Sequence, residues 1–292
     1  MLIHSPLPVH LDRVVILGGG GFVGRLLTQR LREQGVPVLA PGRQELDLAA
    51  PDAGRLLADR LQPRDSLVLL AALTPDKGRG VPPFMANLRM GAAVASALET
   101  VPSAHLVYVS SDAVYPFADS PVDEATAAEP GDLYAAMHLS RELMLKPLDT
   151  PLAILRPTLI YGAADTHNSY GPNRLRRVAR ADGRITLFGD GEERRDHILV
   201  DDVVELILRT LAARSTGLLN LATGQSVSYH DLANRVAACF TRPVDIICTP
   251  RKTPATHRHF DISALRRAFP DFRFTPLDQG LAKVHADMME GE

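Results

Sequence analysis

Residues 14–24 read VVILGGGGFVG, in which four apolar residues lead directly into glycines at Gly18, Gly21 and Gly24. The apolar run predicts a buried strand, and the residues from Phe22 onward predict a helix. Glycines at such a junction let the backbone turn tightly and approach a pyrophosphate, while the helix N-terminus presents unpaired N–H groups to it. The stretch therefore predicts a dinucleotide-binding turn.

The residues that follow decide whether this turn belongs to a βαβ unit, because glycine-rich turns also occur for purely structural reasons. An amphipathic helix is predicted from Phe22 to Gln34, with Gly35 ending it. Residues 36–40 then predict a second short apolar strand. Strand, helix and strand in this order favour the dinucleotide interpretation over the plain turn.

Strands and helices continue to alternate, with no hairpin signal, to about residue 156. This alternation predicts an α/β fold with a doubly wound parallel sheet of the Rossmann type. We expect a dinucleotide-binding domain over residues 1–160 and a smaller C-terminal substrate-binding lobe, interwoven with the sheet, over residues 161–292. In the second half, Asp201 and Ser228 are predicted to cap helices. The further strands are predicted at 66–70, 105–110 and 151–156, and the helices at 51–61, 84–99 and 132–146.

Composition excludes several classes of protein. The formal net charge of −2 gives no basic field for nucleic acid or an anionic membrane surface, and no apolar run approaches the ~20 residues that span a bilayer. Residues 1–12 lack the pattern of a secretory signal. The two cysteines, Cys239 and Cys248, have no metal-ligand spacing. We therefore expect a cytoplasmic protein with no metal site.

Polar residues with catalytic potential follow the strand at 105–110. Ser110, Ser111 and Asp112 stand at its carboxyl end, where open α/β sheets bind ligands. Tyr134 and His138 lie one turn apart on one face of a predicted helix, so they can share a ligand. The end of a strand and the start of a helix would by themselves explain these residues as structural. The glycine turn is the feature that favours a ligand-binding site instead.

Taken together, these features resemble the extended branch of the short-chain dehydrogenase/reductase superfamily, the NAD(P)-dependent epimerase/dehydratase family that acts on nucleotide sugars. The resemblance implies a homodimer that pairs the helices starting near Phe84 and Asp132. It also implies cofactor contacts from residues spread over the first half of the chain. These are Gly18, Gly21, Phe22, Val23, Gly24, Arg43, Asp47, Leu48, Ala71, Ala72, Asn87 and His138, and the resemblance extends to Arg156-Pro157, Tyr161-Gly162, Gly189-Asp190-Gly191 and Arg195–Asp202.

The resemblance implies catalytic roles for Ser111 and Tyr134, which would hold the reacting oxygen of the sugar. In the family, a lysine four residues after the tyrosine lowers the pKa of the phenol and grips the nicotinamide ribose. Here His138 stands at that position, and its ordinary pKa of about 6.5 leaves it mostly neutral at pH 7. Three alternatives follow: His138 works protonated, another cation substitutes, or the redox step is weakened or lost.

Cofactor preference is predicted from the end of the second strand. The acidic residue that accepts the ribose 2′-OH in NAD sites is replaced by Pro41-Gly42-Arg43. A guanidinium in place of a carboxylate favours a 2′-phosphate, so we expect NADP, with NAD as the alternative. Arg43 is alternatively a solvated loop residue.

The residues after Ser111 bear on the reaction. Family dehydratases follow the Ser or Thr with Asp-Glu, whereas here Asp112 precedes Ala113, which disfavours 4,6-dehydration. Residues 43–48 resemble dTDP-4-dehydrorhamnose reductases. Asp112 and Arg195 are expected to bind substrate, and Arg258 is a further candidate for the diphosphate, although both arginines are alternatively surface charges.

The sequence thus predicts an NAD(P)-dependent oxidoreductase or epimerase of a nucleotide-diphosphate sugar, with 4-keto-sugar reduction or 4-epimerisation favoured. Two alternatives stay open. One is a catalytically weakened dinucleotide-binding sensor, on which the replacement at His138 would record lost catalysis. The other is a reductase of a small non-sugar carbonyl compound.

Overall fold

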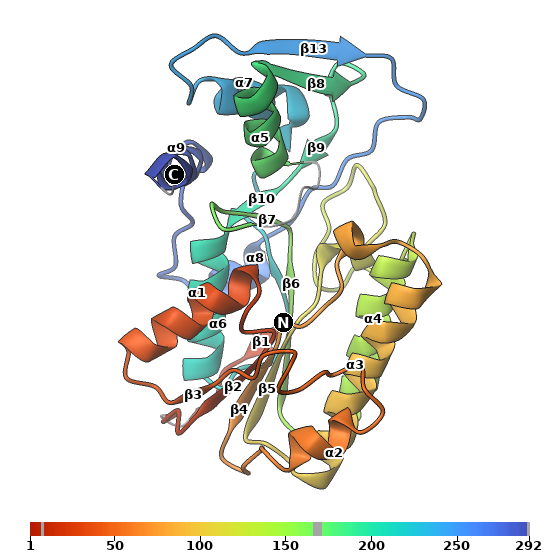
Figure 1. Cartoon of the computed structure of the whole chain (residues 1–292), viewed down its shortest axis with the longest axis vertical. Helices are drawn as coiled ribbons and strands as arrows, with labels where there is room; N and C mark the ends of the chain where they lie inside the picture. The colour runs from red at the N-terminus through yellow and green to blue at the C-terminus, as the bar shows by residue number, and fades with distance from the viewer. Residues whose placement is uncertain (7–8, 166–170, 291–292) are drawn as a thin grey trace.

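A seven-stranded sheet forms the centre of the computed structural model, which describes residues 1–6, 9–165 and 171–290 (Figure 1). Its strand order is β1-β11-β6-β5-β4-β2-β3, and every neighbouring pair is parallel except β1 with β11. The predicted α/β doubly wound fold is therefore confirmed. The strands are β1 (Leu2–Ile3), β2 (Val14–Leu17), β3 (Val38–Leu39), β4 (Ser66–Leu69), β5 (His105–Val109), β6 (Leu152–Pro157) and β11 (Thr216–Leu221).

Helices cover both faces of this sheet, as Figure 1 shows. Alternate residues of β2 enter two separate cores: Val14 and Ile16 lie on the side of α1 and α6, and Val15 and Leu17 on the side of α2 and α3. Full burial of such a side chain contributes about 1.5–3 kcal/mol. The helices of the two layers are α1 (Phe22–Glu33) and α6 (Val200–Ala212), and α2 (Ala53–Ala58), α3 (Val81–Thr100) and α4 (Leu133–Leu145).

A smaller lobe stands above the carboxyl ends of the strands (Figure 1) and has its own apolar core. However, β11, α6 and α8 come from the second half of the chain and pack on the large sheet. The sheet is thus not complete within residues 1–160, and the domain boundary stays a prediction. The remaining elements are η1 (Pro75–Lys77), η2 (Asp112–Val114), β7 (Leu159–Tyr161), α5 (Pro172–Asp182), β8 (Arg184–Phe188), β9 (Arg194–Arg195), β10 (His197–Leu199), β12 (Val227–Ser228), α7 (Tyr229–Ala237), β13 (Asp245–Thr249), α8 (Ser263–Ala268) and α9 (Leu277–Glu290).

The predicted helix ends are partly correct. Gly35 ends α1 with a φ of +74°, and the Ser228 hydroxyl accepts from the Asp231 N–H at 3.0 Å, which caps α7. The prediction that Asp201 caps a helix is wrong. Strand β10 leads directly into α6, so Leu199 occupies the cap position and Asp201 lies in the first turn, where a carboxylate still interacts favourably with the helix dipole.

Two further findings concern the predictions from composition. Among the described helices, none combines the length and the apolar character that a membrane span requires. The thiols of Cys239 and Cys248 are both free, and Cys248 is exposed.

The β2–α1 turn brings backbone segments closer together than any side chain would allow. Gly18 has a φ of +96°, and a Cβ there would lie 2.7 Å from the Ala71 nitrogen. A Cβ on Gly24 would overlap the Gly18 carbonyl oxygen and lie 2.8 Å from the Cα of Gly19. The predicted role of these glycines in a tight turn is therefore confirmed at Gly18 and Gly24.

Gly24→Ala is expected to destabilise the protein by about 2 kcal/mol or more, because the new methyl group meets rigid backbone. Gly20→Ala is the matched control, since nothing lies within 4 Å of a Cβ at that position. Urea unfolding of both variants measures the difference. Equal stability of the two would contradict the close approach.

Candidate functional site

A buried ion pair fixes α4 on the sheet. Arg156 on β6 donates to both carboxylate oxygens of Glu142, at 2.9 and 2.5 Å. The Ser110 hydroxyl donates to the same carboxylate at 2.6 Å, and the Arg156 guanidinium lies 4.7 Å from the centre of the Tyr115 ring. All four residues are buried. Because every charge in this cluster has a partner, α4 is held in one position against β5 and β6.

The first turn of α4 presents Tyr134 to the end of β5. Asp132 caps the helix by accepting from the Ala135 N–H at 2.8 Å. The Ser111 hydroxyl lies within hydrogen-bonding reach of the Tyr134 phenol, and the Tyr134 and His138 rings meet edge to face with centroids 4.7 Å apart. The structure therefore brings together the three residues predicted as catalytic, Ser111, Tyr134 and His138.

Burial is the main influence on the acidity of Tyr134. It raises the pKa of the phenol, and the nearby Tyr108 and Asp112 raise it further. Arg141 and the Ser111 hydroxyl act in the opposite direction. The phenol is consequently protonated at neutral pH, which makes it a proton donor rather than a base in this state.

His138 is a neutral imidazole. Its Nδ1 lies 2.8 Å from the Tyr108 hydroxyl, and the residue is 3 % exposed. Burial, followed by the charge of Arg141, lowers the pKa of His138 to about 3. Of the three alternatives predicted from the sequence, the one in which His138 works protonated is therefore not supported.

The predicted cofactor residues surround the glycine turn and the loop after β4. Asn87 clamps this loop, because its side chain donates to the Leu73 carbonyl at 2.9 Å and accepts from the Leu73 N–H at 2.8 Å. Ala71 donates its N–H to the Leu17 carbonyl at 2.8 Å. Gly18 and Gly24 let the backbone of the turn pack tightly on itself, and no heavy atom lies within 4 Å of a Cβ at Gly20, so the backbone there is open to the close approach of a pyrophosphate. These residues would hold a dinucleotide.

Other predicted contacts are placed less directly. Phe22 packs its ring against Gly162, Leu48 is buried in the core beneath α2, and Val23 is half-buried. Arg43 is exposed and pairs with Asp47 at 3.3 Å. Arg43 thus lies in solvent, as the alternative of a solvated loop residue has it. That Arg43 and Asp47 contact the cofactor stays a prediction.

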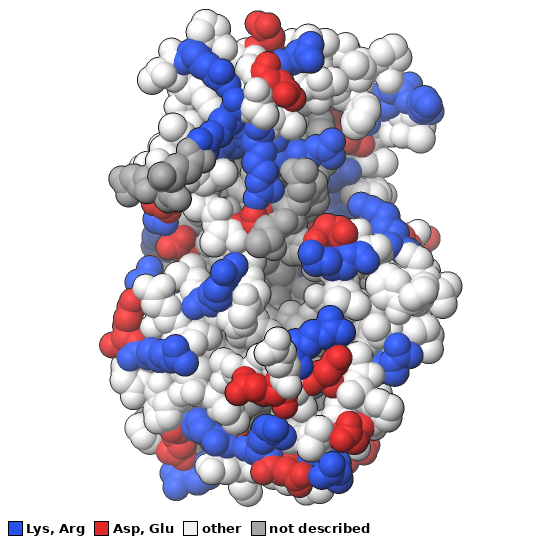
Figure 2. Space-filling view, in the orientation of Figure 1, with Lys and Arg blue, Asp and Glu red and all other residues white. Residues whose placement is uncertain are grey.

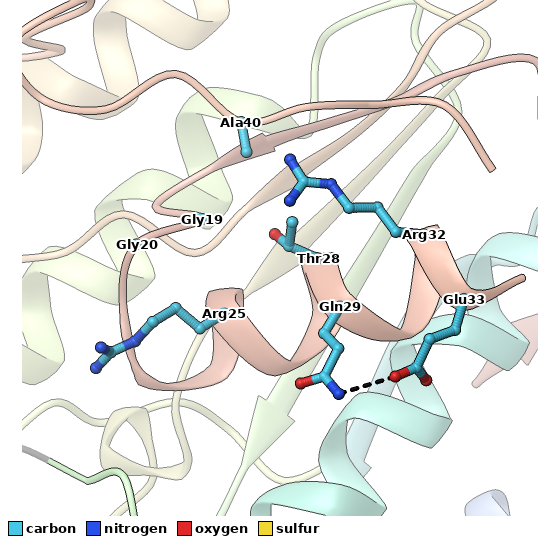
Figure 3. Close-up of a pocket in the computed structure, with 8 residues that line it drawn as sticks. All are labelled: Gly19, Gly20, Arg25, Thr28, Gln29, Arg32, Glu33 and Ala40. Carbon is cyan, nitrogen blue, oxygen red and sulfur yellow. Dashed lines mark hydrogen bonds between the residues drawn. The ribbon is translucent and has the colours of Figure 1, made fainter. Parts of the chain in front are cut away.

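A cavity of about 490 Å³ beside the glycine turn is lined by two arginines, Arg25 and Arg32, that the sequence analysis did not predict as site residues. Figure 3 shows Arg32 and Thr28 pointing from α1 toward Ala40, while Arg25 reaches past Gly20. Their spacing along α1 was a signal, since residues three or four apart lie on one face of a helix. The cavity is lined by Gly19, Gly20, Arg25, Thr28, Gln29, Arg32, Glu33 and Ala40.

Asp112, which was predicted to bind substrate, already forms an ion pair within the protein. It pairs with Arg258 at 3.1 Å, and Arg258 also donates to the Tyr115 carbonyl at 2.6 Å. Arg195 donates to the carbonyl and hydroxyl oxygens of Thr256 at 2.6 and 2.7 Å. Both guanidinium groups lie over the Phe117 ring, at 4.5 Å from its centre for Arg195 and 4.2 Å for Arg258.

Basic side chains also gather on the smaller lobe, over the region of α5 and β8, on the side that faces the large sheet (Figure 2). Helix α5 carries Arg174, Arg177 and Arg180, which are at least partly exposed, whereas its Arg176 is buried. A positive surface beside the carboxyl ends of the strands suits an anionic ligand. Within the described residues, no group of three or more His, Cys, Asp or Glu side chains is arranged to hold a metal ion.

Comparison with known proteins agrees with this geometry. The model of the NAD dependent epimerase/dehydratase family matches residues 14–222. The chain belongs to this family. It is accordingly an NAD(P)-dependent enzyme of the extended short-chain dehydrogenase/reductase type, as the sequence predicted.

Two curated relatives show the range of this similarity. A UDP-glucose 4-epimerase of Mycolicibacterium smegmatis is 28 % identical over 264 residues, covering 79 % of this chain and 83 % of the relative. A dTDP-4-dehydro-6-deoxy-D-allose reductase of Streptomyces bikiniensis is 26 % identical over 317 residues, covering 93 % and 94 %.

Solved structures share the fold. A UDP-N-acetylglucosamine 4-epimerase from Methanobrevibacter ruminantium, in complex with UDP-N-acetylmuramic acid, superposes with a TM-score of 0.84 at 20 % identity, covering 97 % of this chain and 100 % of the other. RMD from Pseudomonas aeruginosa, complexed with NADPH, gives a TM-score of 0.80 at 21 % identity, covering 96 % and 100 %.

The neutral state of His138 predicts a pH dependence of stability. The folded state keeps this imidazole unprotonated until about pH 3, whereas the unfolded chain binds a proton near pH 6.5. Stability present above pH 6.5 is therefore lost as the pH falls toward 3, by up to about 1.4 kcal/mol per pH unit for this residue. Urea unfolding across this range measures the slope. We expect His138→Gln to reduce the slope and the exposed control His10→Gln to leave it unchanged; equal slopes in both variants would refute the prediction.

Proposed function

We propose that the protein reduces or epimerises a nucleotide-diphosphate sugar at a carbon that bears the reacting oxygen, with 4-keto reduction or 4-epimerisation favoured. The observation that carries the proposal is the pairing of the Tyr134 phenol with the Ser111 hydroxyl at the carboxyl end of β5. The curated relatives, which include an epimerase and a reductase of nucleotide sugars, support this substrate class.

In this mechanism, the nicotinamide supplies or accepts a hydride at the sugar carbon when it is bound. Ser111 holds the sugar oxygen, and the protonated Tyr134 donates its proton to that oxygen as a carbonyl becomes an alcohol. In the oxidative direction, the same phenol must first lose its proton and then takes one from the alcohol. The pairing of Asp112 with Arg258 and the Ala113 beside it support reduction or epimerisation over 4,6-dehydration.

Tyr134→Phe is expected to lower turnover at least 10²-fold, because the phenyl ring has no proton to exchange. Ser111→Ala is expected to lower it less. The matched control is Ser103→Ala, which removes a buried hydroxyl near the amino-terminal end of β5. Steady-state assays with UDP-, GDP- and dTDP-sugars measure turnover, and nicotinamide fluorescence verifies that each variant still binds its cofactor.

The neutral His138 favours one second candidate, a dinucleotide-binding sensor with weakened catalysis. The same assays separate the two. A parent protein that binds NADPH yet converts none of the sugars is the sensor. Conversion of a small carbonyl compound with no effect of Arg195→Ala would instead indicate a non-sugar reductase.

We also propose a preference for NADP over NAD. Arg32 points toward Ala40, which directly follows β3 and carries no carboxylate, whereas Arg25 lines the same cavity but is directed away from Ala40 (Figure 3). A 2′-phosphate placed beside Ala40 would meet the Arg32 guanidinium, whereas a 2′-hydroxyl would lack its usual carboxylate partner. The pairing of α3 and α4 in a homodimer stays a prediction of the resemblance.

Arg32→Ala is expected to weaken NADPH binding about tenfold, because a charge-assisted contact to the phosphate is lost, and to leave NADH binding nearly unchanged. Arg30→Ala is the matched control, since Arg30 lies on the same helix but is directed at Asp201 and Glu33. Fluorescence titration with each nucleotide measures the ratio. Parallel losses for NADPH and NADH would refute the preference.

A further inference from the structure

Arg141 is a fully buried arginine on the catalytic helix. It lies seven residues after Tyr134, so Tyr134, His138 and Arg141 share one face of α4. Its side chain passes between α4 and α3, where a Cβ on Gly91 would lie 2.9 Å from the Arg141 Cγ. The glycine on α3 thus makes room for the arginine, whose relative exposure is 0 %.

The guanidinium group of Arg141 contacts neutral acceptors. It donates to the Asn87 carbonyl at 2.9 Å, to the Ala71 carbonyl at 2.8 Å and to the Asn87 side-chain oxygen at 3.4 Å. Among the described residues, no carboxylate lies within 4 Å of it. A buried arginine is usually paired with an acid, because an isolated charge is costly to desolvate. Arg141 therefore keeps an uncompensated positive charge beneath the site.

A chain of polar contacts connects this charge with the catalytic phenol. Arg141 lies within hydrogen-bonding reach of the Tyr108 hydroxyl, which lies 2.8 Å from Nδ1 of His138. Since Arg141 can only donate, the Tyr108 proton is directed to the imidazole and the proton of His138 is on Nε2. That Nε2 atom is buried and has no partner among the described residues. His138 in turn meets the Tyr134 ring edge to face.

We propose that Arg141 supplies the positive charge beside Tyr134 that a lysine at position 138 supplies in the family. The inference rests on the proposed function and deepens it. The charge of that lysine then comes from Arg141, while His138 occupies its place beside the Tyr134 ring and accepts a hydrogen bond from the Tyr108 hydroxyl. Arg141 is a positioning residue that acts through its charge, because it donates its hydrogen bonds to Asn87 and Ala71 and its influence on the Tyr134 phenol is coulombic.

The other charged groups near Tyr134 do not replace this charge. On η2, the charge of Asp112 is balanced by Arg258 at 3.1 Å. On α4, the charge of Glu142 is balanced by Arg156 of β6 at 2.5 Å. Tyr108 on β5 is a neutral phenol, because burial raises its pKa to about 12. His138 is neutral as well. Arg141 therefore provides the net positive field that favours loss of the Tyr134 proton.

The test measures the ionisation of residue 134 without any turnover. A fluorinated tyrosine placed at position 134 is more acidic than tyrosine, and its fluorine NMR shift reports the phenolate. Arg141→Gln removes the charge and is expected to raise this pKa by about one unit. Arg141→Lys keeps the charge and is expected to leave the pKa close to that of the parent. An unchanged pKa in an Arg141→Gln protein that still binds NADPH overturns the inference.

Asn87→Asp is the second variant, for use if Arg141→Gln does not fold. It retains the arginine but places a carboxylate 3.4 Å from the guanidinium, where the amide oxygen now lies, and so cancels the positive field. The fluorine-reported pKa is again expected to rise by about one unit. A pKa equal to that of the parent contradicts the proposal.

The same variants distinguish failure of this inference from failure of the proposed function. If the parent protein converts a nucleotide sugar, the pH–rate profile of Arg141→Gln is expected to move to higher pH by the amount that NMR reports for the phenol pKa. This change is expected to affect kcat more than KM. If the parent converts none, the proposed function fails while the NMR titration still tests Arg141. A normal pH–rate profile in Arg141→Gln, together with an unshifted phenol, removes Arg141 from the mechanism.

Discussion

The buried pair of Glu142 and Arg156 is the interaction on which the site depends. It joins α4 to β6, and through Ser110 it also joins the helix to the end of β5. Loss of either partner would leave an unpaired buried charge, at a cost of about 3–5 kcal/mol. Since Tyr134 is on α4 and Ser111 follows β5, the distance between phenol and hydroxyl is set by this pair rather than by the two residues themselves.

An ion pair is not the only means of fixing a helix, since well-packed apolar residues of similar volume are often as stabilising, and here the charges have a further effect. Glu142 is next to Arg141 in the sequence, yet its carboxylate is engaged by Arg156 of β6 and by Ser110, whereas Arg141 donates to Asn87 of α3. The acid is thereby kept from the guanidinium of its neighbour. The arrangement leaves one positive charge near the Tyr134 phenol without a local counterion.

The sequence predicted those parts of the fold that local patterns determine. The run of apolar residues before Gly18 identifies β2, the glycines identify the turn, and Gly35 and Ser228 identify helix ends, because each effect acts within a few residues. The face shared by Tyr134 and His138 was likewise readable from helical spacing. Asp201 was misjudged because the strand that precedes it, β10, is three residues long and pairs only with distant β7.

What the sequence did not predict depends on contacts between distant residues. The pairing of Asp112 with Arg258 spans 146 positions, and no local pattern indicates that the predicted substrate ligand is already engaged. Arg141 was missed for a similar reason. Its spacing from Tyr134 was visible, but only the packing of α3 against α4 at Gly91 shows that the side chain turns inward instead of toward water.

The Phe117 ring, which the guanidinium groups of Arg195 and Arg258 both contact, affects how quickly an anion would be captured. Two arginines that pack on one aromatic ring are ordered before any ligand arrives, so their side-chain entropy, about 2 kcal/mol for each free arginine, is already lost in the folded state. Encounter is then governed by long-range attraction. Its rate should fall as added salt shortens the Debye length, while the dissociation rate changes less.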